Sequence, residues 1–190
     1  MTLLILGLII FLGTHSISII GPQWRSAVVA RFGVPAWQGL FTLPSLVGFV
    51  MLLSGYGAVQ HDQFVLYDPP TWMRHITLLL MLPVFPLLFA AYLPGRIQSA
   101  VKHPMLLAVK IWALAHLLAN GGLADTLLFG SFLAWAVADR LSLRHRAGPP
   151  VQGAPPGPAN DAIAIVGGLA VYLLFMFWLH RAMMGVAPIG

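Results

Sequence analysis

Long apolar stretches recur along this chain, and they constrain its fold more than any other feature. Each approaches the roughly 20 residues that a helix needs to cross the hydrocarbon core of a bilayer. Only 8% of the residues are charged, against about 25% in soluble domains. We therefore predict an all-α, polytopic membrane helix bundle with six transmembrane helices. The six stretches are Thr2–Ile20, about Ala36–Gly57, Trp72–Leu93, Pro104–Ala119, about Leu123–Leu141 and Ala162–Met184.

The basic residues predict how this bundle is oriented. Cytoplasmic loops of membrane proteins are enriched in Lys and Arg. Only Arg74 and Arg181 fall on one side, whereas seven others fall in the loops after the first, third and fifth helices. We therefore predict that these loops are cytoplasmic and that both termini lie on the non-cytoplasmic side. The basic residues of those loops are Arg25, Arg31, Arg96, Lys102, Arg140, Arg144 and Arg146.

The bundle is predicted to form one domain, residues 1–190. A Pro/Gly-rich stretch at 144–160 separates the last two helices and is typical of a flexible linker, here cytoplasmic. The first helix has neither a basic n-region nor a small-residue cleavage site, so we expect it to be retained. Glycines near Gly55 and Gly167 allow close helix approach, within one chain or between chains.

Composition also excludes several classes of function. The formal charge is +5, but the basic residues are scattered among loops and form no face for nucleic acid. There is no cysteine, which excludes disulfides, thiolate catalysis and Cys-ligated zinc or iron–sulfur clusters. There is also no glutamate, the usual general base of metalloproteases.

Two histidines lie deep in predicted helices on different segments. His15 lies in "FLGTHSIS" and His116 in "IWALAHLLANG". Ionisable residues inside a membrane usually have a partner or a function. Each could simply hydrogen-bond to a neighbouring helix, and Asn120, on the same helix face, could serve His116. Together they predict bis-His ligation of haem b between facing helices; zinc or copper would need a further ligand that the apolar flanks do not offer.

The predicted depths of the two histidines differ. At about 1.5 Å per residue, His15 lies roughly 9 Å inside the cytoplasmic end of its helix and His116 roughly 18 Å. Helix tilt and uncertain helix ends could absorb this difference, so the pair stays a hypothesis.

Three cationic side chains are candidates to hold the haem propionates: Lys110, Arg96 and His103. Lys110 could instead extend to the cytoplasmic interface or bind an anionic headgroup. His103, directly before Pro104, is expected to be interfacial. No chemistry is assigned to His61, His75, His145 or His180.

Four segments resemble the NnrU family of bacterial membrane proteins. They read "FLGTHSISIIGPQWR", "YDPPTWMRHITLLLMLPVF", "AYLPGRIQSAVKHPMLLAVKIWALAHLLANG" and "LLFGSFLAWAVADRLSLRHR". The resemblance covers nearly the whole chain and is most specific from KHP to HLLANG. It implies a multi-pass protein of the bacterial inner membrane that supports denitrification through production of nitrite and nitric oxide reductase activity. A nitric oxide reductase or its assembly machinery is the implied partner, beside the lipid bilayer.

The NnrU family is in turn similar to the plant 15-cis-zeta-carotene isomerase, a haem b enzyme of the membrane. By this resemblance, the "HS" motif matches His15 and Ser16, and a "WCLAH"-like stretch matches Trp112 to His116. Ala113 stands where the isomerase has a cysteine, so an exchange of sulfur and imidazole at the iron is in doubt here. The resemblance implies His15 and His116 as ligands.

Three functions remain open from the sequence. The first is a haem b protein that supports denitrification, the second a non-catalytic assembly factor without cofactor, and the third a haem-dependent cis-trans polyene isomerase. "KHP" is similar to the "RHP" motif of membrane methyltransferases, but the glutamates of those enzymes are absent. Methyl transfer is therefore disfavoured.

Overall fold

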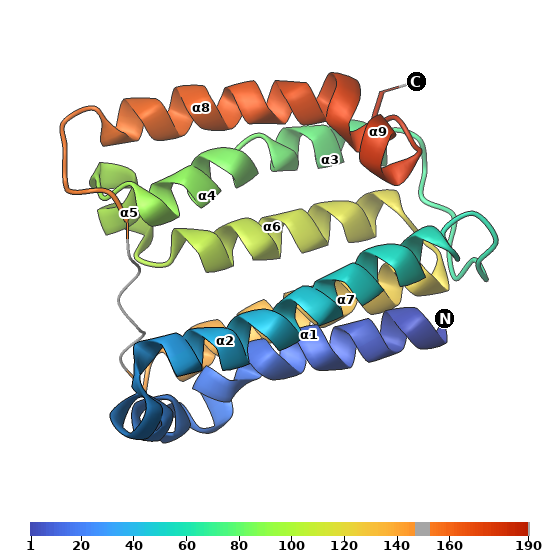
Figure 1. The fold of residues 1–190 in the computed structure, drawn as a ribbon. Helices are drawn as coiled ribbons and strands as arrows, with labels where there is room; N and C mark the ends of the chain where they lie inside the picture. The colour runs from blue at the N-terminus through green and yellow to red at the C-terminus, as the bar shows by residue number, and fades with distance from the viewer. Residues whose placement is uncertain (147–152, 190) are drawn as a thin grey trace.

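The computed structural model describes residues 1–146 and 153–189, which form a bundle of helices (Figure 1). Within these residues the only β pairing is an isolated antiparallel bridge between Val65 and Gly122. The prediction of an all-helical fold is confirmed. The elements are α1 (Thr2–Ile20), α2 (Pro22–Gly57), α3 (Met73–Met81), α4 (Val84–Tyr92), α5 (Arg96–Val101), α6 (Pro104–Ala119), α7 (Leu123–Ser142), α8 (Asn160–Leu174), the π-helix η1 (Phe175–Leu179) and α9 (His180–Met184).

Four of these segments are long and apolar enough to cross a membrane: Thr2–Ile20, Pro22–Gly57, Met73–Tyr92 and Asn160–Met184. α6 is also apolar but has only 16 residues. α7 has 20 residues and carries three charged side chains, Asp125, Asp139 and Arg140. A membrane protein is therefore supported, with four candidate spans by length and composition.

Two predicted helices differ from the observed ones in a way that glycine and proline explain. The segment before the second predicted span is itself helical, so that α2 begins at Pro22 and bends at Gly33, where φ is 83° and ψ is 169°. Pro35 lies two residues after the bend. The third predicted span is interrupted between α3 and α4 at Leu82 and Pro83, because proline cannot donate the helical hydrogen bond.

The outer surface of the bundle is apolar. Ile9 is 63% exposed, Val166 68% and Phe177 71%. Soluble proteins rarely expose contiguous apolar surface of this kind, whereas lipid tails contact it at no cost. The exposed side chains therefore agree with a bilayer as the surrounding medium.

Glycines allow α1 and α2 to pack backbone to backbone. A Cβ atom added at Gly7 would lie 2.7 Å from the amide nitrogen of Leu52, and one added at Gly48 would lie 2.7 Å from that of Phe11. Gly55 faces the backbone of Leu4 in the same way. Small residues commonly bring membrane helices this close. The close approach predicted near Gly55 is therefore made within the chain.

The two ends of the chain lie at the same end of the bundle, with α5 at the other end (Figure 1). α5 was not predicted. Asp161, in the first turn of α8, accepts hydrogen bonds from the backbone amides of Arg96 (2.9 Å) and Ile97 (3.1 Å) at the start of α5. Part of the predicted linker, residues 147–152, lies outside the described residues. In its described part, the Ala154 amide donates to the Tyr92 carbonyl at 2.8 Å, so the linker contacts the end of α4.

Candidate functional site

The two predicted ligand histidines make the same hydrogen bond, each within its own helix. The Nδ1–H of His15 donates to the Phe11 carbonyl at 2.7 Å, and that of His116 to the Trp112 carbonyl at 2.8 Å. A carbonyl only accepts, so Nδ1 carries the proton in both rings. In the neutral ring the Nε2 lone pair is then left for another partner. Metal-ligating histidines usually donate their second ring N–H to a carbonyl or a carboxylate in this way.

His15 lies among aromatic side chains of α1, α2 and α7. Its ring stacks on Phe11 at 4.2 Å and meets Phe41 edge-on at 5.0 Å and Trp135 at 6.0 Å. The indole Nε1–H of Trp135 is buried and has no hydrogen-bond partner among the described residues. A buried donor without an acceptor costs free energy. A polar atom from a bound molecule would satisfy it.

His116 lies near the end of α6, in contact with α7 and α9. Its ring stacks on Phe129 at 4.6 Å and lies 5.3 Å from Trp112. The ring of His180 is 6.4 Å away, with an angle of 20° between the two planes. The structure therefore brings His116 together with a histidine to which the sequence assigned no chemistry.

The structure does not bring His15 and His116 together. Contacts between them run through three other rings: Phe11 lies 5.6 Å from Phe132, which lies 5.4 Å from Trp112. These aromatic side chains link the two histidines in a continuous series of ring contacts. A hydrogen bond was expected between Asn120 and the ring of His116. Instead, the side-chain amide of Asn120 donates to the backbone carbonyl of His116 at 2.9 Å.

His180 owes its place to an irregular stretch of backbone. The π-helix η1 ends at Leu179, directly before it. Beyond α9, Gly185 adopts a left-handed φ of 75°, and the chain folds back so that the Nδ1–H of His180 donates to the Val186 carbonyl at 2.8 Å. Its Nε2 is thus left unprotonated, as in the other two rings. Hydropathy does not reveal a π-helix, so sequence reasoning missed this neighbour of His116.

A buried carboxylate lies at the same end of the bundle. Asp125 is 5% exposed and accepts hydrogen bonds from the hydroxyl of Tyr56 (2.6 Å), the side chain of Gln63 (3.0 Å) and the amide of Gly122 (3.0 Å). It stands in the first turn of α7, where the helix dipole stabilises an anion. Sequence reasoning overlooked it, although an acid just after "NGG" at the start of an apolar run is a helix-capping pattern.

Two of the three cations predicted to bind haem propionates lie away from His116. His103 directly precedes α6; burial and the charges of Arg140, Lys102 and Lys110 lower its pKa, and Asp139 opposes them. Arg96 begins α5 and is exposed. Lys110 is nearer, six residues before His116, or about 9 Å along the helix axis.

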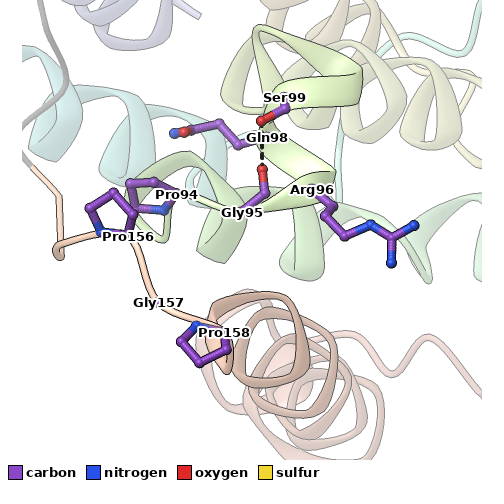
Figure 2. Close-up of a pocket in the computed structure, with 8 residues that line it drawn as sticks. All are labelled: Pro94, Gly95, Arg96, Gln98, Ser99, Pro156, Gly157 and Pro158. Carbon is purple, nitrogen blue, oxygen red and sulfur yellow. Dashed lines mark hydrogen bonds between the residues drawn. The ribbon is translucent and has the colours of Figure 1, made fainter.

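Among the cavities that the described residues form, two reach the surface beside residues considered above. The larger, about 720 Å³, lies between the α4–α5 turn and the segment before α8 and is lined by Pro94, Gly95, Arg96, Gln98, Ser99, Pro156, Gly157 and Pro158. Figure 2 shows Arg96 extending away from the prolines of this hollow. The smaller, about 260 Å³, is polar; Asn120 and Asp125 help to line it, with Gln60, His61, Gln63 and Tyr67. Only the second lies beside His116, because Asn120 is one helical turn from it.

In the described residues, no three His, Asp, Cys or Glu side chains come together to hold a metal ion. A bare zinc ion normally takes at least three protein ligands. Haem needs only axial ligands, since the porphyrin supplies the other four nitrogens. Imidazoles with free Nε2 atoms in an aromatic, water-poor setting therefore fit haem better than a bare ion.

Comparison with known proteins identifies the family of the chain. No curated protein and no solved structure matches the chain. The family model described as "NnrU protein" matches residues 3–188, which is nearly the whole length. The chain therefore belongs to the NnrU protein family.

Proposed function

We propose that this protein binds haem b in the bacterial inner membrane through buried histidines and supports denitrification, that is, production of nitrite and nitric oxide reductase activity. His116 and His15 are the ligands predicted from the sequence. The role in denitrification follows from resemblance to the NnrU family. The haem proposal rests on the chain's own side chains.

One observation carries the haem proposal. His15 and His116 each donate Nδ1–H to the carbonyl four residues earlier, at 2.7 and 2.8 Å. This bond selects the tautomer whose Nε2 is unprotonated and can give its lone pair to a metal. It also fixes the orientation of the ring relative to its own helix. Haem b, when bound, supplies a one-electron redox centre. The surrounding Phe and Trp rings exclude water from it.

The packing sets a condition on the predicted pair. A single iron bound by both His15 and His116 requires Phe11, Phe132 and Trp112 to leave the interval between them. Binding at His116 alone requires no such change. Near His15, the unsatisfied Nε1–H of Trp135 would donate to a carboxylate of the haem. Of the three cations, Lys110 is the closest to His116 along α6, but a separation of six residues turns its side chain about 120° from the His116 face.

We also propose the six-span arrangement, with both termini outside the cytoplasm. It is supported by the basic residues whose charges act on His103, namely Arg140, Lys102 and Lys110. His103 directly precedes α6 and follows α5, which lies at the end of the bundle away from the termini (Figure 1). Basic residues concentrate on the cytoplasmic side. α6 and α7 would complete the six spans.

The haem proposal is tested by haem content. The protein is purified in detergent from haem-replete cells, and haem b is measured by the pyridine haemochrome method beside His116→Ala and His15→Ala. We expect about one haem per chain and loss of it in His116→Ala, with His75→Ala, an exposed histidine of α3, as the matched control. Apo protein from wild-type cells would refute the proposal.

A second function is favoured by the filled core. Because aromatic rings already occupy the space between His15 and His116, the protein can be a non-catalytic assembly factor whose histidines only pack. Cells that lack the chain are complemented with His116→Ala, and nitric oxide reductase activity is measured at matched membrane levels. Full activity favours the assembly factor, whereas loss of activity together with haem favours the haem protein.

A further inference from the structure

His180 has no part in the predicted ligand pair, yet its ring is the imidazole that contacts His116. We propose that His116 and His180 form the two-imidazole site of the haem iron, with His180 in place of His15 as the second axial ligand. This inference rests on the proposed function, because it names a ligand for the haem that the protein is proposed to bind.

The donor atoms of the two rings are matched. The Nδ1–H of His116 donates to the Trp112 carbonyl and that of His180 to the Val186 carbonyl, both at 2.8 Å. Each ring therefore keeps a free lone pair on Nε2. Neutral imidazoles of this tautomer, fixed through Nδ1, are the form that coordinates metals.

The spacing of the rings matches two ligands on opposite sides of one metal. Metal–nitrogen bonds are about 2.0 to 2.1 Å, and a ring centroid lies about 1.1 Å behind its nitrogen. Two opposed imidazoles therefore have centroids about 6.3 Å apart, whereas two ligands of a tetrahedral ion have centroids about 5 Å apart. The observed centroid distance of 6.4 Å equals that of the opposed arrangement, which in addition requires both Nε2 atoms to face the iron. His15 is separated from His116 by three rings and has no such spacing.

The backbone around His180 is built to hold this ring. The π-helix η1 inserts one extra residue per turn just before it, and such insertions are rare and frequent at functional sites. After α9, the side chain of Gln60 donates to the Met184 carbonyl at 3.0 Å, which ties the last turn to the loop after α2. The position of His180 is thus fixed from two directions.

The site selects haem over a bare metal ion. In the part of the chain that the structure describes, no third His, Cys, Asp or Glu joins the pair to form a metal cluster. The nearby carboxylate of Asp125 is already engaged by Tyr56, Gln63 and Gly122. Two nitrogen donors suffice only when the other coordination positions belong to the ligand itself, as in an iron porphyrin.

The test compares His180→Gln with His15→Gln in the full-length, detergent-purified protein. A glutamine at 180 keeps a polar side chain of similar length and removes the imidazole that would ligate the iron. The ferric absorption and electron paramagnetic resonance spectra report whether the iron is low-spin with two axial imidazoles. His75→Gln, on exposed α3 surface, is the matched control.

We expect His180→Gln to convert the low-spin iron to high-spin, and added imidazole to restore the low-spin spectrum. Restoration of the low-spin spectrum by imidazole would show that the variant has lost an iron ligand and not its fold. His15→Gln and His75→Gln should keep the wild-type spectrum. A low-spin spectrum that persists in His180→Gln and vanishes in His15→Gln would overturn this inference and leave the proposed function standing. A wild-type protein without haem would overturn both.

Discussion

The hydroxyl of Tyr56, near the end of α2, donates a hydrogen bond of 2.6 Å to the buried carboxylate of Asp125 at the start of α7. The side chain of Gln63 donates to the other carboxylate oxygen at 3.0 Å. A charge inside an apolar bundle is costly unless its oxygens are satisfied. This network therefore joins α2, the following loop and α7 at the end of the bundle beside His116.

Tyr56→Phe removes one donor to this carboxylate and leaves the ring in place. Since a hydrogen bond to a charged group contributes about 1.5 to 3 kcal/mol, we expect the free energy of unfolding to fall by about that amount. Thermal unfolding in detergent measures it, with Tyr92→Phe, at a tyrosine that is 48% exposed, as the control. Equal melting temperatures for both variants would show that the network adds no stability.

Gly7→Ala tests the close packing of α1 on α2. The added Cβ would lie 2.7 Å from the Leu52 amide nitrogen, so the helices must separate, at a cost of about 1 to 3 kcal/mol. Gly13→Ala in the same helix is the control, because nothing lies within 4 Å of its Cβ and alanine favours helix. The melting temperature should fall for the first variant and hold or rise for the second; the reverse order would contradict the packing.

Much of the helical layout was predictable because hydropathy reports directly on burial in lipid. α6 has the predicted bounds, Pro104–Ala119, since a proline suits the first turn of a helix and the "NGG" segment follows its end. The bend at Gly33 was not predicted, although the Gly-x-Pro pattern at 33–35 allows it. The short helix α5 depends on capping by Asp161, a residue distant in sequence, which no local pattern reveals.

The candidate site was predictable only in part. Burial of His15 and His116 followed from their apolar flanks, and their different predicted depths were an early sign that they lie apart. Which side chains lie next to these histidines depends on how each surrounding helix is rotated about its axis. An insertion of one residue in a helix changes that rotation for all residues after it. The π-helix before His180 makes such an insertion, so the contact between His116 and His180 could not be read from spacing.

Trp135→Phe tests whether a bound molecule satisfies the buried indole Nε1–H. Without a ligand this donor is unsatisfied, so its removal should leave the apo protein as stable as before or more stable. If haem offers an acceptor there, the variant should release haem faster to apomyoglobin. Trp178→Phe, at a tryptophan that is 62% exposed, is the control. Equal rates of haem release from both variants would show that Trp135 donates no hydrogen bond to the haem.

The proposed topology is testable because the chain has no cysteine of its own. Single cysteines at Asp62 and Ser99, both exposed, report on the loop after α2 and on α5. In intact spheroplasts, we expect an impermeant maleimide to label Asp62→Cys at once and Ser99→Cys only after permeabilisation. The opposite pattern would show that the protein has the inverted orientation. Immediate labelling of both cysteines would show that the membrane does not separate the two positions.

The central claim is that buried imidazoles hold haem b, and the reduced-minus-oxidised absorption spectrum of the purified wild-type protein tests it most directly. We predict the sharp α and Soret bands of a low-spin b-type haem, lost in His116→Ala and kept in His75→Ala. A featureless spectrum from correctly inserted protein, expressed in haem-replete cells, would contradict the claim and return the histidines to packing roles.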